Sequence, residues 1–139
     1  MSWLIWSILA ALFAAATALL AKIGVAGVDP NLAAAVRTSV VVIFTWIIAV
    51  SVGSHAGVMH IDKRSWLFLA LSGVATGLSW ICYFHALSVG PVSKVAPIDK
   101  LSVVLVILAA WPILGEKLTP GKLLGGGLIA AGAIVLALS

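Results

Sequence analysis

The ionisable residues inside long apolar stretches are the residues of this sequence that could carry chemistry. Arg37 lies in the apolar stretch that follows Asp29, and Asp99 and Lys100 are neighbours in a later one. A charged side chain in hydrocarbon is costly, so such residues mark a substrate or ion pathway, or form a buried ion pair. Lys22 closes the first apolar stretch, and its ammonium either joins this group or extends to the membrane surface. Both interpretations stay open.

Aromatic side chains accompany these charges at helical spacing. Trp80 and Tyr83 fall on one face with Phe84 and Leu87. An aromatic face beside a cavity can bind an apolar or cationic ligand, and core packing is the alternative. The predicted substrate-binding residues are therefore Lys22, Arg37, Trp80, Tyr83, Asp99 and Lys100.

The balance of charge among these residues predicts the chemistry of the substrate. Three basic side chains, those of Lys22, Arg37 and Lys100, stand against the single carboxylate of Asp99. This excess favours a substrate with a negative group. Asp99 could also carry a proton, because desolvation favours the neutral form of a carboxyl group.

Pro97 lies two residues before Asp99 and cannot donate a helical hydrogen bond. Broken helices at membrane depth recur at the binding sites of transporters. We expect the helix to continue through this segment, with neighbouring side chains about 100° apart around its axis. On that geometry, Asp99 and Lys100 cannot share one partner. One would pair with Arg37, and the other would face a cavity.

Five apolar segments position these residues. The chain has 139 residues, 63% of them hydrophobic and only 9% charged. Helices are predicted at about residues 2–23, 31–53, 65–89, 92–114 and 121–138, each long enough to cross a bilayer. The first is expected to be a retained helix, because it lacks the basic start and short apolar core of a signal peptide. The predicted fold class is an all-α integral membrane protein with five transmembrane helices in one domain, 1–139.

Several function classes are disfavoured by composition. Five spans leave no residues within these 139 for a soluble catalytic part, and the sequence holds no nucleotide-binding, zinc-protease or serine-hydrolase motif. His55 and His60 alone do not make a metal site, and the single cysteine, Cys82, cannot form an internal disulfide. The eight basic residues are dispersed, unlike a nucleic-acid-binding patch. We therefore predict no enzyme activity, no cofactor, no metal and no nucleic-acid partner.

Glycines and basic residues bear on assembly. Gly73 with Gly77, and Gly121 with Gly125, form G-x-x-x-G spacings, which serve a subunit interface or packing within one chain.

Five spans place the chain ends on opposite sides of the membrane. One side collects Lys63, Arg64, Lys117 and Lys122, and the other collects Lys22, Arg37, Lys94 and Lys100. Without the intramembrane Arg37 and Lys100, the weak bias points the N-terminal side toward the cytoplasm. A chain with so weak a bias could insert in both directions.

Three segments give the sequence a family resemblance. They are the run W-I-C-Y-F-H-A-L at 80–87, the segment Pro91 to Lys100 ending in A-P-I-D-K, and G-E-K-L-T at 115–119 before a glycine-rich last helix. Together they resemble the EamA domain, the repeat unit of the drug/metabolite transporter superfamily. The resemblance covers essentially the whole chain. The sequence looks like a five-helix, single-repeat prokaryotic branch.

The resemblance implies both an activity and a partner. Most relatives carry two inverted repeats around a central cavity, so a single repeat implies an antiparallel homodimer or a related five-helix chain as partner. The implied function is a secondary transporter that moves a small metabolite by alternating access across the inner membrane of a prokaryotic cell. A flippase for a lipid-linked sugar and a non-transporting accessory subunit are the alternatives. The first helix lacks the embedded glutamate of the four-helix multidrug exporters, which argues against their mechanism of exporting cationic drugs.

Overall fold

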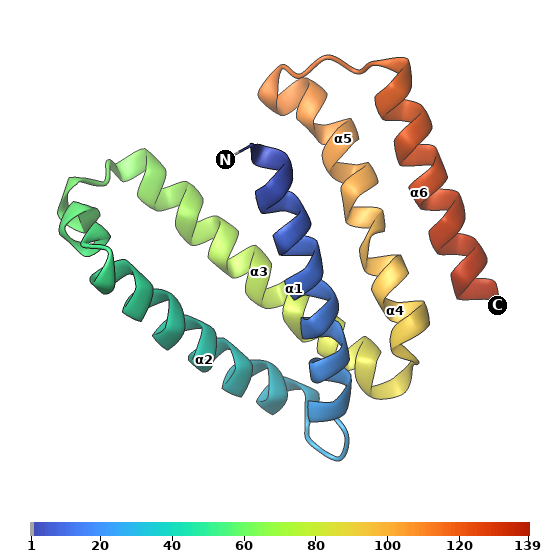
Figure 1. Cartoon of the computed structure of the whole chain (residues 1–139), viewed down its shortest axis with the longest axis horizontal. Coiled ribbons are helices and arrows are strands. Elements are labelled where there is room, and N and C mark those ends of the chain that lie inside the picture. Colours follow the sequence, from blue (N-terminus) through green and yellow to red (C-terminus); the bar gives the residue numbers. More distant parts are fainter. Residues whose placement is uncertain (1) are drawn as a thin grey trace. The chain divides into compact units, whose positions relative to one another are not determined.

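The described part of the chain, residues 2–139 of a computed structural model, is helical and contains no strand. Its elements are α1 (Trp3–Gly24), α2 (Pro30–Ser51), the short 3-10 helix η1 (Ser54–His60), α3 (Lys63–Val89), α4 (Val92–Asp99), α5 (Leu101–Leu114) and α6 (Pro120–Leu138) (Figure 1). Five stretches are long and apolar enough to cross a membrane, and α4 and α5 together make the fourth. The predicted all-α fold with five membrane-spanning segments is confirmed.

Large apolar side chains cover the outside of these helices. Phe13 in α1, Phe44 in α2 and Leu128 in α6 each expose more than half of their surface. Exposure of such an apolar surface to water is unfavourable, whereas contact with lipid tails is not. The hydrocarbon core of a bilayer is therefore the medium that suits this chain.

The helices fall into two compact units. One holds α1 up to Leu20 with α4, α5 and α6, and the other runs from Ala21 to Ser88 and holds the last turn of α1, α2, η1 and α3. That the whole chain forms one domain stays a prediction.

Aspartates start both long helices of the unit Ala21–Ser88. The Asp29 carboxylate accepts hydrogen bonds from the backbone N–H groups of Asn31 and Leu32, at 2.9 and 3.0 Å, and Pro30 fills the first turn of α2. Asp62 accepts from the N–H groups two and three residues further on, at 3.1 and 3.2 Å. Such bonds satisfy donors that a helix start leaves without partners. They explain why α3 begins at residue 63, before the predicted start at 65.

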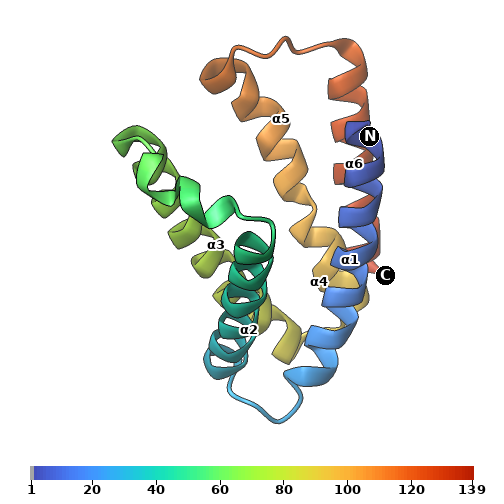
Figure 2. The ribbon, with the colours of Figure 1, turned by 60° about the vertical axis from the view of Figure 1, so that its left-hand side comes forward.

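The core of this unit lies where its helices approach one another. Its buried side chains are Ala21, Val25, Ala34, Phe84 and Leu87. Leu87 is fully buried. At the opposite end of the unit, η1 occupies part of the predicted polar loop, after Gly53 has turned the chain with a φ of +78° (Figure 2). Arg37, Trp80 and Tyr83 thus sit on two helices whose ends are fixed by capping and packing.

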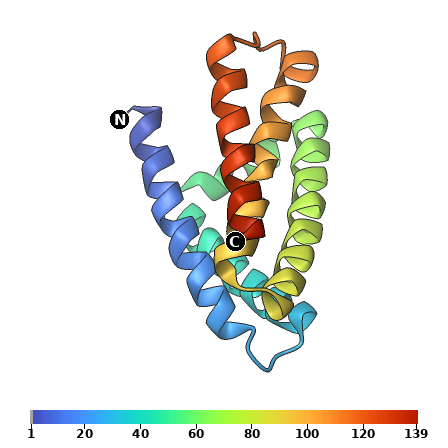
Figure 3. The same ribbon diagram turned by 90° about the vertical axis from the view of Figure 1, so that its right-hand side faces the viewer.

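In the other unit, α6 lies along both α4 and α5 (Figure 3). Gly126 is buried at this contact, and a Cβ added there would lie 3.5 Å from Cδ1 of Ile107. Thr119 caps α6 by accepting a hydrogen bond from the N–H of Lys122. Glu116 joins the turn to α6 through an ion pair with Lys122, 2.8 Å long. The α5–α6 hairpin is thereby fixed at its turn and along its length.

Among the described residues, most glycines of the G-x-x-x-G spacings meet no neighbouring helix of their own unit. A Cβ added at Gly73, Gly77 or Gly125 would have no atom within 4 Å, and one at Gly121 would meet only the Thr119 hydroxyl, at 4.0 Å. Of the glycine-rich segment of α6, Gly126 is the residue that packs against α5. Whether the other glycines serve a subunit interface stays a prediction.

Candidate functional site

Arg37 stacks on an aromatic ring in the unit Ala21–Ser88. Its guanidinium carbon lies 4.0 Å from the centroid of the Trp80 ring, and both side chains are half-buried. Tyr83, about one helical turn beyond Trp80, lies within electrostatic range of Arg37. A cation over an indole face gains a favourable interaction with the ring quadrupole. The stacking also keeps the N–H donors at the edge of the guanidinium plane, where they can bind a carboxylate or phosphate.

The other half of the aromatic face serves packing. Phe84 and Leu87 are buried, whereas Trp80 and Tyr83 are half-buried. Core packing thus accounts for Phe84 and Leu87, and a role of Trp80 and Tyr83 in ligand binding stays a prediction. The sequence spacing alone did not separate the pair beside Arg37 from the pair in the core.

Lys22 holds the end of α3. Its ammonium donates a hydrogen bond to the carbonyl oxygen of Leu87, in the last turn of that helix. The last turn of α3 has no basic residue of its own. A cation from another helix therefore satisfies carbonyl groups that a helix end leaves without partners and favours the negative end of its dipole.

Lys94 binds the end of a helix in the same way in the other unit, and this role was not predicted from the sequence. Its ammonium donates to the carbonyl of Ala137 at 3.3 Å, near the end of α6, which also lacks a basic residue in its last turn. The sequence contained a signal for this contact: the last turn of α6 has no cation of its own, and Lys94 lies near the start of a helix whose start is expected on the same side of the membrane.

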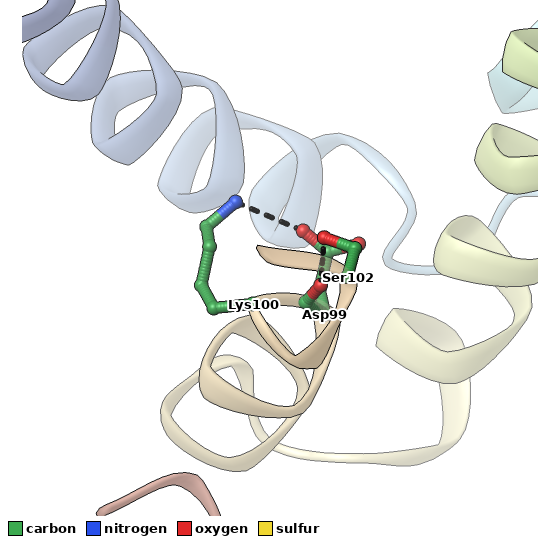
Figure 4. A network of polar contacts seen from close by, with 3 residues as sticks. All are labelled: Asp99, Lys100 and Ser102. Atoms are coloured by element: carbon green, nitrogen blue, oxygen red, sulfur yellow. Dashed lines mark hydrogen bonds and ion pairs between the residues drawn. The ribbon is translucent and has the colours of Figure 1, made fainter. Parts of the chain in front are cut away.

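Asp99 and Lys100 lie at the break between α4 and α5, in the unit that contains α6. The Lys100 ammonium is 2.9 Å from Oδ2 of Asp99, and the Ser102 hydroxyl donates to the Asp99 carbonyl at 2.7 Å (Figure 4). The backbone turns tightly here. The N–H of Lys100 donates to the carbonyl of Pro97, and that of Val103 donates to the carbonyl of Lys100, each at 3.0 Å.

This arrangement corrects two expectations. The helix was predicted to continue through Lys100, and the side chains of Asp99 and Lys100 were predicted to have different partners. Instead the helix breaks after Asp99, and the two residues pair with each other. The cause is local, because Pro97 cannot donate a backbone hydrogen bond and the chain closes with three-residue turns. The long lysine side chain then folds back to its neighbour.

The remaining carboxylates all lie outside the spans. Asp29 and Asp62 accept hydrogen bonds at helix starts, and Glu116 pairs with Lys122. Hydrogen bonds from the side chain and backbone of Ser65 lower the pKa of Asp62. Asp99 is therefore the one carboxylate within a membrane-spanning segment of the described chain. The described residues also contain no group of three or more His, Cys, Asp or Glu side chains that could hold a metal ion.

Known proteins match this chain along its length. The EamA-like transporter family matches residues 1–138. An uncharacterized transporter encoded in the cobO 3' region of a Sinorhizobium species is 47% identical over 136 residues, which cover 98% of this chain and 96% of the relative.

Two further relatives match about half of the chain. A probable 4-amino-4-deoxy-L-arabinose-phosphoundecaprenol flippase subunit, ArnF of Erwinia tasmaniensis, is 44% identical over 72 residues, or 50% of this chain and 55% of the relative. A probable 4-amino-4-deoxy-L-arabinose-phosphoundecaprenol flippase subunit, ArnE of Salmonella paratyphi B, is 38% identical over 71 residues, or 51% of this chain and 62% of the relative. No solved structure matches the chain.

Proposed function

The chain belongs to the EamA-like transporter family, and from this premise we propose that it is a secondary transporter that moves a small metabolite by alternating access. A transporter role and a multi-pass membrane protein follow from the family and the five candidate spans. The inner membrane of a bacterial cell is the proposed location. Charged residues within the spans support a polar substrate, because apolar cargo would not repay their cost.

The stacking of Arg37 on Trp80 is the observation that carries the substrate class. Both carboxylates of the same unit, Asp29 and Asp62, are occupied at helix starts. Arg37 therefore receives its stabilisation from an aromatic ring rather than from an acid of its own unit. A guanidinium held in this way suits an anionic substrate, with Trp80 and Tyr83 contacting its less polar part. Lys22, Asp99 and Lys100 complete the proposed set of binding residues.

A single five-helix repeat needs a partner to enclose a binding cavity. We propose an antiparallel homodimer or a pair with a related five-helix chain, since inverted repeats are a recurrent architecture of secondary transporters. Two partial relatives are themselves named as subunits, which supports an assembly of small chains.

The anionic class is tested by ligand-induced thermal stabilisation of the purified protein. A ligand that binds only the folded state raises its melting temperature. The screen compares anionic, neutral and cationic metabolites on the wild type, Arg37→Gln and Arg64→Gln. Arg64 is a matched control because it also lies over an aromatic ring, but in the first turn of α3. Its guanidinium carbon is 5.9 Å from the centroid of the Phe68 ring.

We expect stabilisation by anionic compounds that is lost in Arg37→Gln and kept in Arg64→Gln. Compounds that pass this screen are then tested for counterflow in proteoliposomes. Stabilisation by neutral or cationic compounds alone, or equal responses in both variants, would contradict the anionic class.

A flippase for a lipid-linked sugar is the second candidate, favoured by the names of the two partial relatives. In that case Arg37 would bind the phosphate of a polyprenyl chain. The discriminating measurement is a competition between undecaprenyl phosphate and the soluble anions from the screen. Preference for the lipid would select the flippase. The third alternative, a non-transporting accessory subunit, predicts co-purification with one fixed partner and wild-type behaviour of Asp99→Asn.

A further inference from the structure

Asp99 stands apart from every other acid in the chain. The fourth candidate span runs from Val92 to Leu114, and Asp99 lies about 10 Å along it, roughly a third of the way from its start. Its side chain retains 36% of its exposure, and that of Lys100 retains 55%, so the pair is accessible from outside its own helices. An ion pair in this position is not sealed into a core.

In the described part of this unit, the other charged side chains are those of Lys94, Glu116, Lys117 and Lys122. Along α1 up to Leu20 there is no charged side chain. The one charged side chain of α6, that of Lys122, is paired with Glu116 at the far end of α5, with Lys117 in the same turn. Lys94 on α4 binds the Ala137 carbonyl. Within its unit, Asp99 therefore depends on Lys100 for charge compensation, and Lys100 depends on Asp99.

We propose that the Asp99–Lys100 pair couples transport to protons by exchanging one partner of Lys100 for another. A proton from water binds a carboxylate oxygen of Asp99, removes its charge and breaks the ion pair. The ammonium of Lys100 then binds the negative group of the substrate. On the other side of the membrane the substrate leaves, Asp99 releases its proton to water, and the pair re-forms. One proton thus accompanies each negative charge.

The break between α4 and α5 makes this exchange local. Lys100 is held by the turn that its own backbone N–H and carbonyl form with Pro97 and Val103, so its side chain can change partner without moving a helix. The Ser102 hydroxyl binds the backbone carbonyl of Asp99 rather than its carboxylate. Protonation of the carboxylate therefore leaves the Ser102 contact in place.

The inference rests on the proposed anionic substrate, and the test separates the two. Benzenesulfonate is the probe, because its charge does not change over the working pH range. Binding to the purified full chain is measured in weakly buffered solution, with an indicator dye to record proton uptake. The wild type is expected to take up about one proton per anion bound. Above the pH at which the free pair is fully ionised, its affinity should fall about tenfold per pH unit.

Three variants sharpen the result. Asp99→Asn should bind the anion without proton uptake and with an affinity that no longer falls as pH rises. Because this change leaves a lysine without its acid, Asp99→Asn with Lys100→Gln is the second variant, and it should lose both the proton uptake and the added affinity. Glu116→Gln removes a carboxylate outside the spans and should behave as the wild type does.

The outcomes distinguish the proton coupling from the proposed substrate class. Binding without proton uptake in the wild type overturns the coupling and leaves the proposed anionic transporter standing. Proton uptake that persists in Asp99→Asn assigns it to another group and also overturns the coupling. No binding of the anion to the wild type overturns the substrate class, and the coupling with it.

Discussion

At the scale of single residues, Asp62 determines where α3 begins, because its carboxylate accepts hydrogen bonds from the backbone N–H groups of Arg64 and Ser65. These bonds need the ionised carboxylate. The pKa of Asp62 in the folded protein is lowered, chiefly by Ser65, so ionisation is favoured by folding. Its contribution to stability is present above the pKa of an unfolded aspartate, about 3.9, and is lost as pH falls through the lowered folded value.

The start of α3 is therefore expected to remain protected at neutral and mildly acidic pH and to fray only below the ordinary aspartate range. The measurement is amide hydrogen exchange at Arg64 and Ser65 in micelles as pH is lowered. Asp62→Asn should lose this pH dependence, while the start of α2, capped by Asp29, keeps its protection. Equal fraying of both starts in the variant would show that the effect is global.

Residue types were sufficient to identify Arg37, Asp99 and Lys100 as intramembrane charges. They were not sufficient to pair them. The partner of Arg37 depends on which half of an aromatic face is buried, and spacing does not reveal that. The partner of Asp99 depends on a break in the helix. The side chains of Asp99 and Lys100 were expected to point in different directions, and with the break they pair with each other.

At the scale of elements, Gly126 is a small residue of α6 that lies against Ile107 of α5. A Cβ at Gly126 would lie at ordinary van der Waals distance from Ile107, so Gly126→Ala should be tolerated. Gly126→Leu should force the helices apart and destabilise the protein by about 1–3 kcal/mol. The measurement is thermal unfolding of the purified protein in detergent.

Gly125→Leu is the matched control, because a Cβ at this neighbouring position meets no atom within 4 Å. We expect it to leave the unfolding of the single chain unchanged. Should this face of α6 form the subunit interface, the same variant would weaken dimers measured by cross-linking. Equal destabilisation by Gly125→Leu and Gly126→Leu would contradict the packing described for α6.

The helical character and the number of the spans could be predicted, because an apolar block of this length is expected to form a helix that crosses the bilayer. Element ends were harder. The start of α3 moved because Asp62 caps it. The fourth span divided because Pro97 precedes three-residue turns, and a proline in a sequence does not reveal whether a helix bends around it or stops.

At the scale of the whole molecule, the proposed antiparallel homodimer requires that one chain inserts in both directions. The test is labelling of single cysteines at His55 and at Ser139, in a Cys82→Ala background, from each side of the membrane. We expect each position to react from both sides. Labelling of each position from one side only would contradict the homodimer and direct attention to an oppositely inserted partner chain.

Lys22 and Lys94 illustrate that a charge can act at two stages in the life of a membrane protein. During insertion, before the helices pack, both lysines lie near the ends of candidate spans, where basic residues influence the orientation of the chain. After packing, both are bound to carbonyl oxygens at the ends of α3 and α6. Replacement of either lysine would therefore alter first the direction in which a newly made chain inserts and later the cohesion of the finished bundle. A single substitution would therefore change both the direction of insertion and the packing of the helices, although the two effects arise at different times.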